Sequence, residues 1–318
     1  MSNCGTGCSG MNVTPRLRAY AAACLLMLTG SAVAETRISV LYPESAPAYV
    51  KLYQAIVDGM TQAGDVRLRS RSVSERDSAD EVRAWTAANQ SQATVVLGEL
   101  PPGLTGPLAA TMPLIYGAGA LNDNSQPGVS LASSPAQMFR RLKQIKPDVE
   151  RVFVVFRPQA TGWLVAAGRT AAREQGIELV ASTCDDVQQA GVAFSRILQQ
   201  ARPGKDAIWL TLDPVVPLNQ LLPVLLRESW DKHLVLFSNN PVDVAKGALF
   251  ALYPDYPTMG RQLAERARRQ LARTAPAGPE ASEHLNSAFN TRTASHLGLV
   301  LSDQQLQAFD RIFPEAQK

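Results

Sequence analysis

Short apolar runs alternate with stretches of helical periodicity along most of the chain. Residues 37–42 (RISVLY) and 152–156 (VFVVF) have the length of strands, and their apolar content suits burial on both faces of a sheet. Between such runs the apolar residues recur every three or four positions, as they do from Ala48 to Ala63. Strands that alternate with helices predict parallel sheets with right-handed crossovers.

The first half of the chain predicts a β-α-β-α-β-α-β order. Ser78 and Glu81 form a capping box that begins one of its helices, and Gly64 ends the helix at 48–63. Residues 121–134 are rich in Asn, Ser, Gly and Pro, which is typical of a segment that crosses between lobes. The predicted strands of this half are residues 37–42, 66–73, 93–98 and 113–116.

The same alternation begins again after Ser134, which precedes a helix with Pro135 at its first position. Two similar halves joined by a crossing predict a two-lobed α/β protein. The final third predicts a strand, a helix, a loop at 274–282 and a further strand. A short helix that Asn290 begins and a last helix at 303–313 that Ser302 begins complete it. The strands predicted in the second half are residues 152–156, 178–182, 207–212, 234–238, 248–253 and 283–289.

The first 34 residues have the pattern of an export signal. Arg16 and Arg18 precede an apolar run at 19–33, and residues 32–34 (AVA) form a small-x-small cleavage site that predicts cleavage after Ala34. The run is shorter than the roughly 20 residues that a transmembrane helix needs. Met11 is an alternative start to Met1, because residues 1–10 add no charge to the pattern, and a lipid anchor on Cys24 is a second alternative to cleavage.

Loss of the leader leaves a chain with almost no net charge. Of the 318 residues 284 remain, with 29 basic and 28 acidic side chains, since only Arg16 and Arg18 leave. This balance argues against nucleic acid as a partner. Cys184 becomes the single cysteine, so an internal disulfide and a cysteine-cluster metal site are both excluded.

Motifs for catalysis and cofactors are missing from the sequence. The three histidines, His233, His284 and His296, have no metalloprotease spacing, and neither a G-x-S-x-G elbow nor a phosphate-binding GxxxxGK[ST] loop occurs. The glycines at 117 and 119 do not complete a dinucleotide-binding fingerprint, because position 122 is Asn. We therefore expect no enzyme activity, no cofactor and no metal.

Polar residues directly after predicted strands are the candidate ligand contacts. In open α/β sheets, ligands bind outside the carboxyl ends of the strands, where loops and helix N-termini present N–H groups. Each residue alone is as well explained by a solvated loop or a helix cap, and the prediction rests on their convergence on one cleft. The predicted ligand-binding residues are Tyr42, Glu44, Ser45, Glu99, Asn122, Arg157, Thr161, Asp213 and Asn239.

From about residue 134 to residue 313 the sequence resembles a family of ABC-transporter substrate-binding proteins similar to tryptophan- and phenylalanine-binding proteins. Asp213 stands in the place of the family's strand-end aspartate. The first lobe departs from the family pattern, because it is shorter and lacks a Gly-rich stretch after its first helix. The segments that carry the resemblance are residues 147–156, 175–179, 206–210, 244–249, 255–262 and 290–299.

The resemblance implies the type I periplasmic binding fold, with two Rossmann-like lobes joined by a three-strand hinge. It implies an N-terminal lobe of residues 35–132 plus 248–282 and a C-terminal lobe of residues 133–247 plus 283–318. A periplasmic protein would then capture a small polar solute, such as an amino acid, in the cleft for a membrane ABC permease. The alternative is a ligand-sensing periplasmic subunit that signals to a membrane kinase or cyclase, which the altered first lobe favours.

Overall fold

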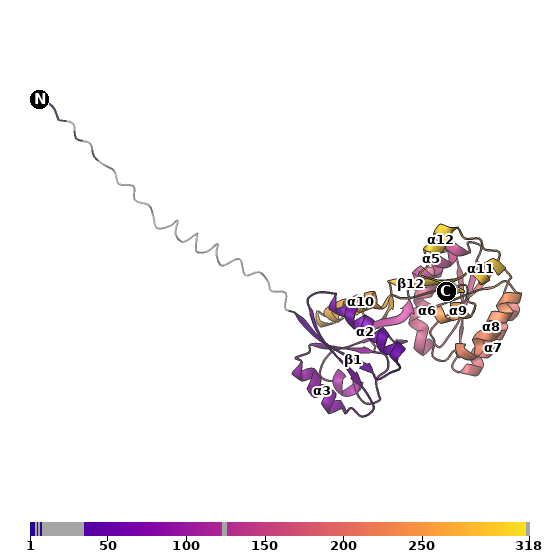
Figure 1. Cartoon of the computed structure of the whole chain (residues 1–318), viewed down its shortest axis with the longest axis horizontal. Helices are drawn as coiled ribbons and strands as arrows, with labels where there is room; N and C mark the ends of the chain where they lie inside the picture. Colours follow the sequence, from indigo (N-terminus) through magenta and orange to yellow (C-terminus); the bar gives the residue numbers. More distant parts are fainter. Residues whose placement is uncertain (4, 6, 8–34, 123–125, 316–318) are drawn as a thin grey trace. The chain divides into compact units, whose positions relative to one another are not determined.

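The computed structural model describes residues 1–3, 5, 7, 35–122 and 126–315 (Figure 1). Most of the predicted leader lies outside the described residues, including Met11, Cys24 and Ala34 at the predicted cleavage point. From Thr36 onward the chain forms one compact unit. Within that unit the described strands form two sheets, so the predicted α/β fold with two parallel-sheet lobes is confirmed.

The first sheet has the strand order β11-β5-β4-β3-β1-β2 within the described residues, and all its neighbouring strands run parallel. Its strands are β1 (Thr36–Pro43), β2 (Val66–Val73), β3 (Ala93–Leu97), β4 (Leu114–Gly117), β5 (Gly128–Ser133) and β11 (Pro279–Ser282). The helices of this lobe are α2 (Pro47–Thr61), α3 (Ala79–Ala88), α4 (Thr105–Ala109) and α10 (Tyr256–Leu271).

The second sheet has the order β13-β12-β10-β9-β8-β6-β7, and in the part of the chain described its one antiparallel pair is β10 with β12. Its strands are β6 (Arg151–Phe156), β7 (Glu178–Thr183), β8 (Asp206–Leu210), β9 (Val235–Ser238), β10 (Phe250–Pro254), β12 (Leu285–Asn290) and β13 (Arg311–Phe313). Its helices are α5 (Pro135–Ile145), α6 (Pro158–Glu174), α7 (Val187–Gln200), α8 (Leu218–Asp231), α9 (Pro241–Lys246), α11 (Thr291–His296) and α12 (Asp303–Gln307).

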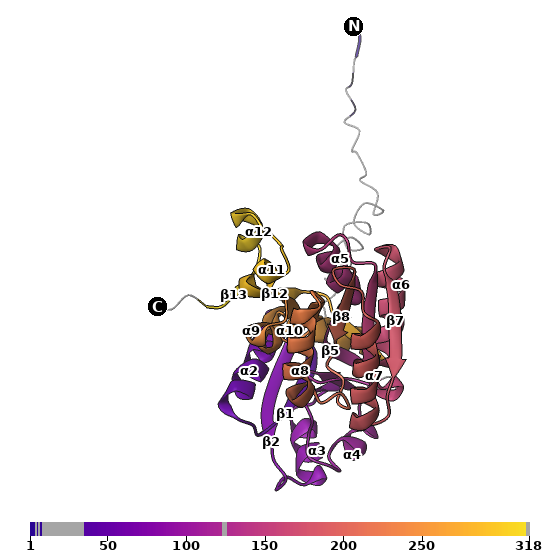
Figure 2. The ribbon, with the colours of Figure 1, turned by 90° about the vertical axis from the view of Figure 1, so that its right-hand side faces the viewer.

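Both faces of each sheet are covered, which is why the strands are apolar at successive positions. In β6 the buried residues alternate: Val152 and Val154 pack in the core with α5 and α6, whereas Phe153 and Val155 pack with α7 and α8. The first sheet is divided in the same way between α2 with α10 and α3 with α4. Figure 2 shows the helices arranged around the strands from a second direction.

The described chain passes between the two sheets three times. It crosses from β5 to α5, from β10 to α10 and from β11 to β12. Buried serines tie these passages to one another: Ser133 Oγ donates to the Leu252 carbonyl at 2.7 Å, and Ser282 Oγ donates to the Ser130 carbonyl at 2.8 Å. These bonds satisfy polar groups that have no access to water, so they fix the crossings as one unit.

One lobe assignment is corrected by the strand pairing. The sequence places residues 248–254 in the N-terminal lobe, but β10 pairs with β9 and β12 of the second sheet. The pattern of apolar residues is the same in either sheet, so it does not specify the partner strand. The crossing therefore follows β10, between Pro254 and Tyr256, and does not precede it.

Two segments differ in structure from the sequence prediction, whereas the five-residue helix α4 lies where the predicted order places a helix, between the strands at 93–98 and 113–116. Residues 128–133 (GVSLAS) form strand β5, although their Gly and Ser content indicates a loop. The final helix ends at Gln307, and residues 311–313 form an edge strand instead. Both predicted capping boxes, at Ser78 and Ser302, are confirmed.

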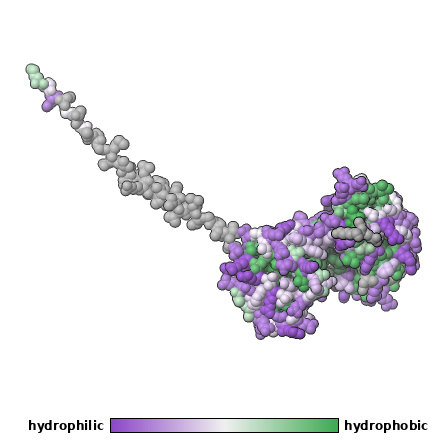
Figure 3. Space-filling model, viewed as in Figure 1, coloured by the Kyte–Doolittle hydropathy of each residue, from purple (hydrophilic) through white to green (hydrophobic). Residues whose placement is uncertain are grey.

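Polar and apolar residues are mixed on the face of both lobes that Figure 3 shows. Helices that reach both the length and the hydropathy needed to cross a bilayer do not occur among the described residues.

Helices α2 and α10 touch through their backbones. A Cβ placed on Gly59 would lie 1.9 Å from the Pro257 carbonyl oxygen, and one on Gly260 would lie 2.0 Å from the Ile56 carbonyl oxygen. Real Cβ atoms do not approach oxygen this closely, so a side chain at either position forces the helices apart. This contact attaches α10, which arrives after the second crossing, to the first lobe.

We expect Gly260→Ala to destabilise the protein by about 1–3 kcal/mol, because the added methyl group overpacks a backbone contact that cannot yield. The matched control is Gly191→Ala in α7, where no atom lies within 4 Å of the new Cβ. That exchange should stabilise by about 0.5–1 kcal/mol through helix propensity alone. Thermal unfolding of both variants measures the difference, and a Gly260→Ala protein as stable as Gly191→Ala would contradict the close contact.

Candidate ligand-binding site

The two sheets share one strand pattern that selects where a ligand can bind. In the first sheet β2 lies on one side of β1 and β3 on the other, and β7 and β8 flank β6 in the same way. Chain connections leave such a pair of strands in opposite directions, which opens a crevice at their carboxyl ends. By this rule the candidate ligand positions are the ends of β1 and β3 in one lobe and of β6 and β8 in the other.

In the first lobe the predicted residues lie at this switch point. Tyr42 is in β1, Glu44 and Ser45 follow it, and Glu99 follows β3. Glu44, Ser45 and Glu99 are exposed, and Tyr42 is half-buried. Both carboxylates are thus in contact with solvent at the place where an incoming ligand would pass.

Tyr53 of α2 belongs to this group, although the sequence indicated only a core position for it. Its ring lies 5.6 Å from that of Tyr42, centroid to centroid. Its hydroxyl would lie 2.4 Å from a Cβ on Gly98, whose φ of +68° already favours glycine. Burial raises the pKa of the Tyr53 phenol, and a hydrogen bond with Ser45 partly opposes the rise. A protonated phenol therefore stands between the ends of β1 and β3.

In the second lobe Asp213 forms a hydrogen-bond network with two other predicted residues, Arg157 and Thr161. Its Oδ2 accepts hydrogen bonds from the Arg157 N–H at 2.8 Å and from Thr161 Oγ1 at 2.5 Å, and its Oδ1 accepts one from the Val215 N–H at 3.0 Å. The carboxylate is buried and occupied by protein donors at the N-terminus of α6. Asp213 thereby fixes the loop from which the exposed Arg157 side chain extends.

Asn239 and Thr211 form a buried polar pair beside this network. The pairing of Leu210 with Ser238 sets Thr211 and Asn239 next to each other as β8 and β9 end. Asn239 Oδ1 accepts a hydrogen bond from the Trp209 indole at 3.1 Å. Within the described part of the chain, Asn239 Nδ2 and Thr211 Oγ1 have no hydrogen-bond partner, although both residues are at most 3% exposed. Unpaired buried polar groups are costly, so a ligand that pairs with both would bind favourably.

Asn122 lies in the segment between β4 and β5. It is half-buried, and its N–H donates to Gln126 Oε1 at 3.4 Å. The adjacent Leu121 carbonyl accepts a hydrogen bond from the Trp163 indole at 2.9 Å. Since Trp163 belongs to α6, this bond joins a first-lobe segment to the helix that Asp213 holds.

The structure thus groups the predicted residues by lobe. Tyr42, Glu44, Ser45 and Glu99 gather at the first switch point, and Arg157, Thr161 and Asp213 gather at the second. The sequence did not indicate Tyr53 or Thr211, because their positions depend on contacts between distant segments. Groups of three or more His, Cys, Asp or Glu side chains that could hold a metal ion do not occur among the described residues.

The chain is similar to several solved structures at low sequence identity. One is a conserved domain protein from Vibrio cholerae, which is 18% identical to this chain with a TM-score of 0.54. The match covers 87% of this chain and 99% of the Vibrio cholerae chain. An ABC domain from Streptococcus pneumoniae in complex with L-Trp is 16% identical with a TM-score of 0.54, covering 88% of this chain and 100% of its own. The fold is that of the type I periplasmic binding proteins.

A third structure with this fold is a substrate-binding protein with adhesive properties from Clostridium difficile, in a ligand-free, open form. It is 13% identical with a TM-score of 0.56, covering 87% of this chain and 98% of its own. Neither a protein-family model nor a curated protein sequence matches the chain. The likeness to solved structures at these identities therefore shows the fold alone.

Cys184 lies close to the second-lobe network and is 1% exposed. Burial raises the pKa of its thiol to about 11, and the negative charges of Asp213 and Asp185 add to the rise. Only the thiolate attacks disulfide reagents, so the native thiol should be unreactive near neutral pH.

We expect the native protein to react with a coloured disulfide reagent at pH 8 at least about 100-fold more slowly than the unfolded protein, because a two-unit rise in pKa lowers the thiolate fraction about 100-fold. Cys184 is the single cysteine after residue 34, so a protein of residues 35–318 gives one signal. The unfolded protein in guanidinium is the control, and complete native labelling at the unfolded rate would contradict the burial of this thiol.

Proposed function

We propose that the chain is an exported solute-binding protein that holds a small polar solute between its two lobes for a membrane ABC permease. The proposal rests on two neighbouring buried groups at the carboxyl ends of β8 and β9, Thr211 Oγ1 and Asn239 Nδ2, which have no hydrogen-bond partner among the described residues. A hydroxyl and an amide N–H, buried and unsatisfied beside a switch point, favour a ligand with hydrogen-bonding groups.

Charged side chains of both signs follow the ends of β1, β3 and β6. Glu44 and Glu99 are exposed in the first lobe, and Arg157 is exposed in the second. An amino acid, which presents an amine and a carboxylate, requires such an arrangement. The Tyr42 and Tyr53 rings offer an apolar surface for its side chain. The Streptococcus pneumoniae structure, described as a complex with L-Trp, supports an amino acid as the first class to test.

A sensor subunit that signals to a membrane kinase or cyclase would use the same site with a different partner. Ligand binding alone does not separate the two roles. The proposed transport role is supported by substrate-binding and ABC proteins among the solved structures of this fold.

We expect one class in a library of amino acids, purines, sugars and organic acids to raise the unfolding midpoint of refolded residues 35–318. At 100 times its dissociation constant a ligand stabilises by about 2.7 kcal/mol. For a chain of this size that amount corresponds to a rise of roughly 5–10 °C. Refolding removes any solute carried through purification, and mass spectrometry of the unrefolded protein under native conditions identifies such a solute directly. A protein that carries no solute and responds to none of the library would overturn the proposal.

We expect Thr211→Val to have opposite effects on stability and on binding. Without ligand the variant should be about 1 kcal/mol more stable, since it removes an unpaired buried hydroxyl. The ligand-induced rise in midpoint should fall, because the hydrogen bond to the ligand is lost. The matched control is Thr86→Val in α3, where the buried hydroxyl donates to the Arg83 carbonyl at 2.9 Å. The control should lose stability and keep the full ligand response; an unchanged ligand response in Thr211→Val would place the solute elsewhere.

A further inference from the structure

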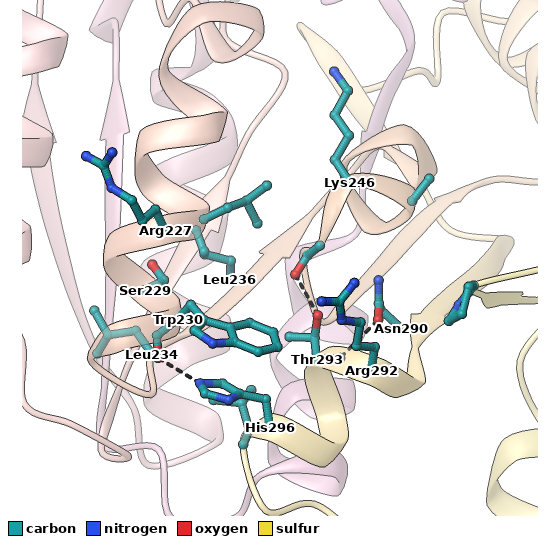
Figure 4. A pocket seen from close by; sticks show the side chains of 15 residues that line it. Arg227, Ser229, Trp230, Leu234, Leu236, Lys246, Asn290, Arg292, Thr293 and His296 are labelled. Carbon is teal, nitrogen blue, oxygen red and sulfur yellow. Dashed lines mark hydrogen bonds between the residues drawn. The ribbon is translucent and has the colours of Figure 1, made fainter.

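A pocket of about 390 Å³ lies on the C-terminal lobe (Figure 4). It borders the amino-terminal half of β9 through Leu234 and Leu236, whereas Asn239 of the candidate site follows the carboxyl end of that strand. The helices α8, α9 and α11 supply most of its walls. Its volume falls in the range of small-molecule sites. None of the predicted ligand-binding residues lines it.

One wall of the pocket is a fixed aromatic stack. The Trp230 and His296 rings lie 3.5 Å apart, centroid to centroid, with 10° between their planes. The His296 Nε2 atom donates a hydrogen bond to the Trp230 carbonyl at 2.8 Å, which holds the imidazole in place. The His233 ring lies 4.9 Å from that of His296. Leu226 and Leu236 add aliphatic surface, so a flat apolar group finds a preformed surface here.

The charged side chains of the pocket are all cationic. Arg227, Lys246 and Arg292 line it, and no Asp or Glu does. The guanidinium of Arg292 lies 5.9 Å from the centre of the Trp230 ring. Within the described residues neither Arg292 nor Lys246 forms an ion pair, and Arg227 approaches only its neighbour Glu228, at 3.6 Å. Asp243 also interacts electrostatically with Lys246. Three cations beside an apolar wall, with Arg292 in no ion pair among the described residues, favour an anionic ligand.

Ser229 provides an independent indication that a ligand belongs in the pocket. It lines the pocket and is 2% exposed, yet its hydroxyl has no hydrogen-bond partner among the residues described. A helical serine ordinarily satisfies its hydroxyl at the carbonyl one turn earlier. An unpaired buried hydroxyl is costly, so a ligand in the pocket that pairs with it would relieve that cost.

We propose that this pocket binds a small carboxylate with a planar apolar body. The apolar body would lie against Trp230 and the leucines, the carboxylate would meet Arg292 and Lys246, and a polar group on the ligand would pair with Ser229. The inference stands on residues separate from the strand-end site, and it does not depend on the proposed function.

Benzoate is the probe for this site, with benzyl alcohol as its neutral analogue and inorganic phosphate as an anion without an apolar body. The ¹H–¹⁵N spectrum of residues 35–318 reports binding through the Trp230 indole N–H, and Gly98 and Asn239 report on the other site. We expect millimolar benzoate to shift the Trp230 signal while Gly98 and Asn239 stay in place. Benzyl alcohol and phosphate should each bind at least about tenfold more weakly, since each lacks one of the two recognised features.

Two variants test the named contacts. Arg292→Gln should weaken benzoate about tenfold, because it removes a charge-assisted hydrogen bond. Ala245→Phe, at an exposed pocket position, should fill the entrance and abolish binding. Arg196→Gln on the exposed face of α7 is the matched control and should bind benzoate normally.

The proposal is overturned if benzoate leaves Trp230 unmoved or shifts Gly98 and Asn239 instead. It is also overturned if phosphate or benzyl alcohol binds as well as benzoate, or if Arg292→Gln binds like the wild type.

Discussion

The tie between the three chain crossings is the constraint on which the two-lobed structure depends. Neither lobe is built from one continuous segment: the first needs α10 and β11, which the chain supplies only after it has built most of the second sheet. Ser133 and Ser282 hydrogen-bond buried carbonyls of Leu252 and Ser130, so the passages support one another. The glycine contact between α2 and α10 then secures the returning helix.

The parallel direction of the strands determines where the candidate site lies. Because neighbouring strands run in one direction, their carboxyl ends meet at one edge, and the residues after them converge. Asp213 shows how this edge is stabilised: its carboxylate takes two N–H groups and the Thr161 hydroxyl and so fixes the start of α6. Among the described residues, Thr211 Oγ1 and Asn239 Nδ2 at the ends of β8 and β9 have no hydrogen-bond partner, and under the proposed function they would meet the ligand.

Local signals in the sequence were sufficient for most of the elements. The capping boxes at Ser78 and Ser302 and the strand at 66–73 involve residues close in sequence, and all three are found as predicted. The lobe predicted for β10 was wrong, because an apolar strand has the same sequence pattern in either sheet. Strand β5 was missed because its Gly and Ser residues are buried by neighbours that only the sheet provides.

Contacts between distant segments explain what the sequence did not reveal about the sites. Tyr53 joins the first switch point through Gly98, and Thr211 meets Asn239 through strand register. The stack of Trp230 on His296 likewise joins residues 66 positions apart. The sequence predicted which residue types follow the strands. It did not predict that Thr211 and Asn239 lie next to each other, because that depends on strand register.

Amide hydrogen exchange with and without the stabilising solute tests the proposed binding site, because it locates the bound solute along the chain. We predict slower exchange in the loops after β1, β3, β6 and β8 and around Asn239, in both lobes together. Protection confined to one lobe away from these strand ends, or no protection at all, would contradict it.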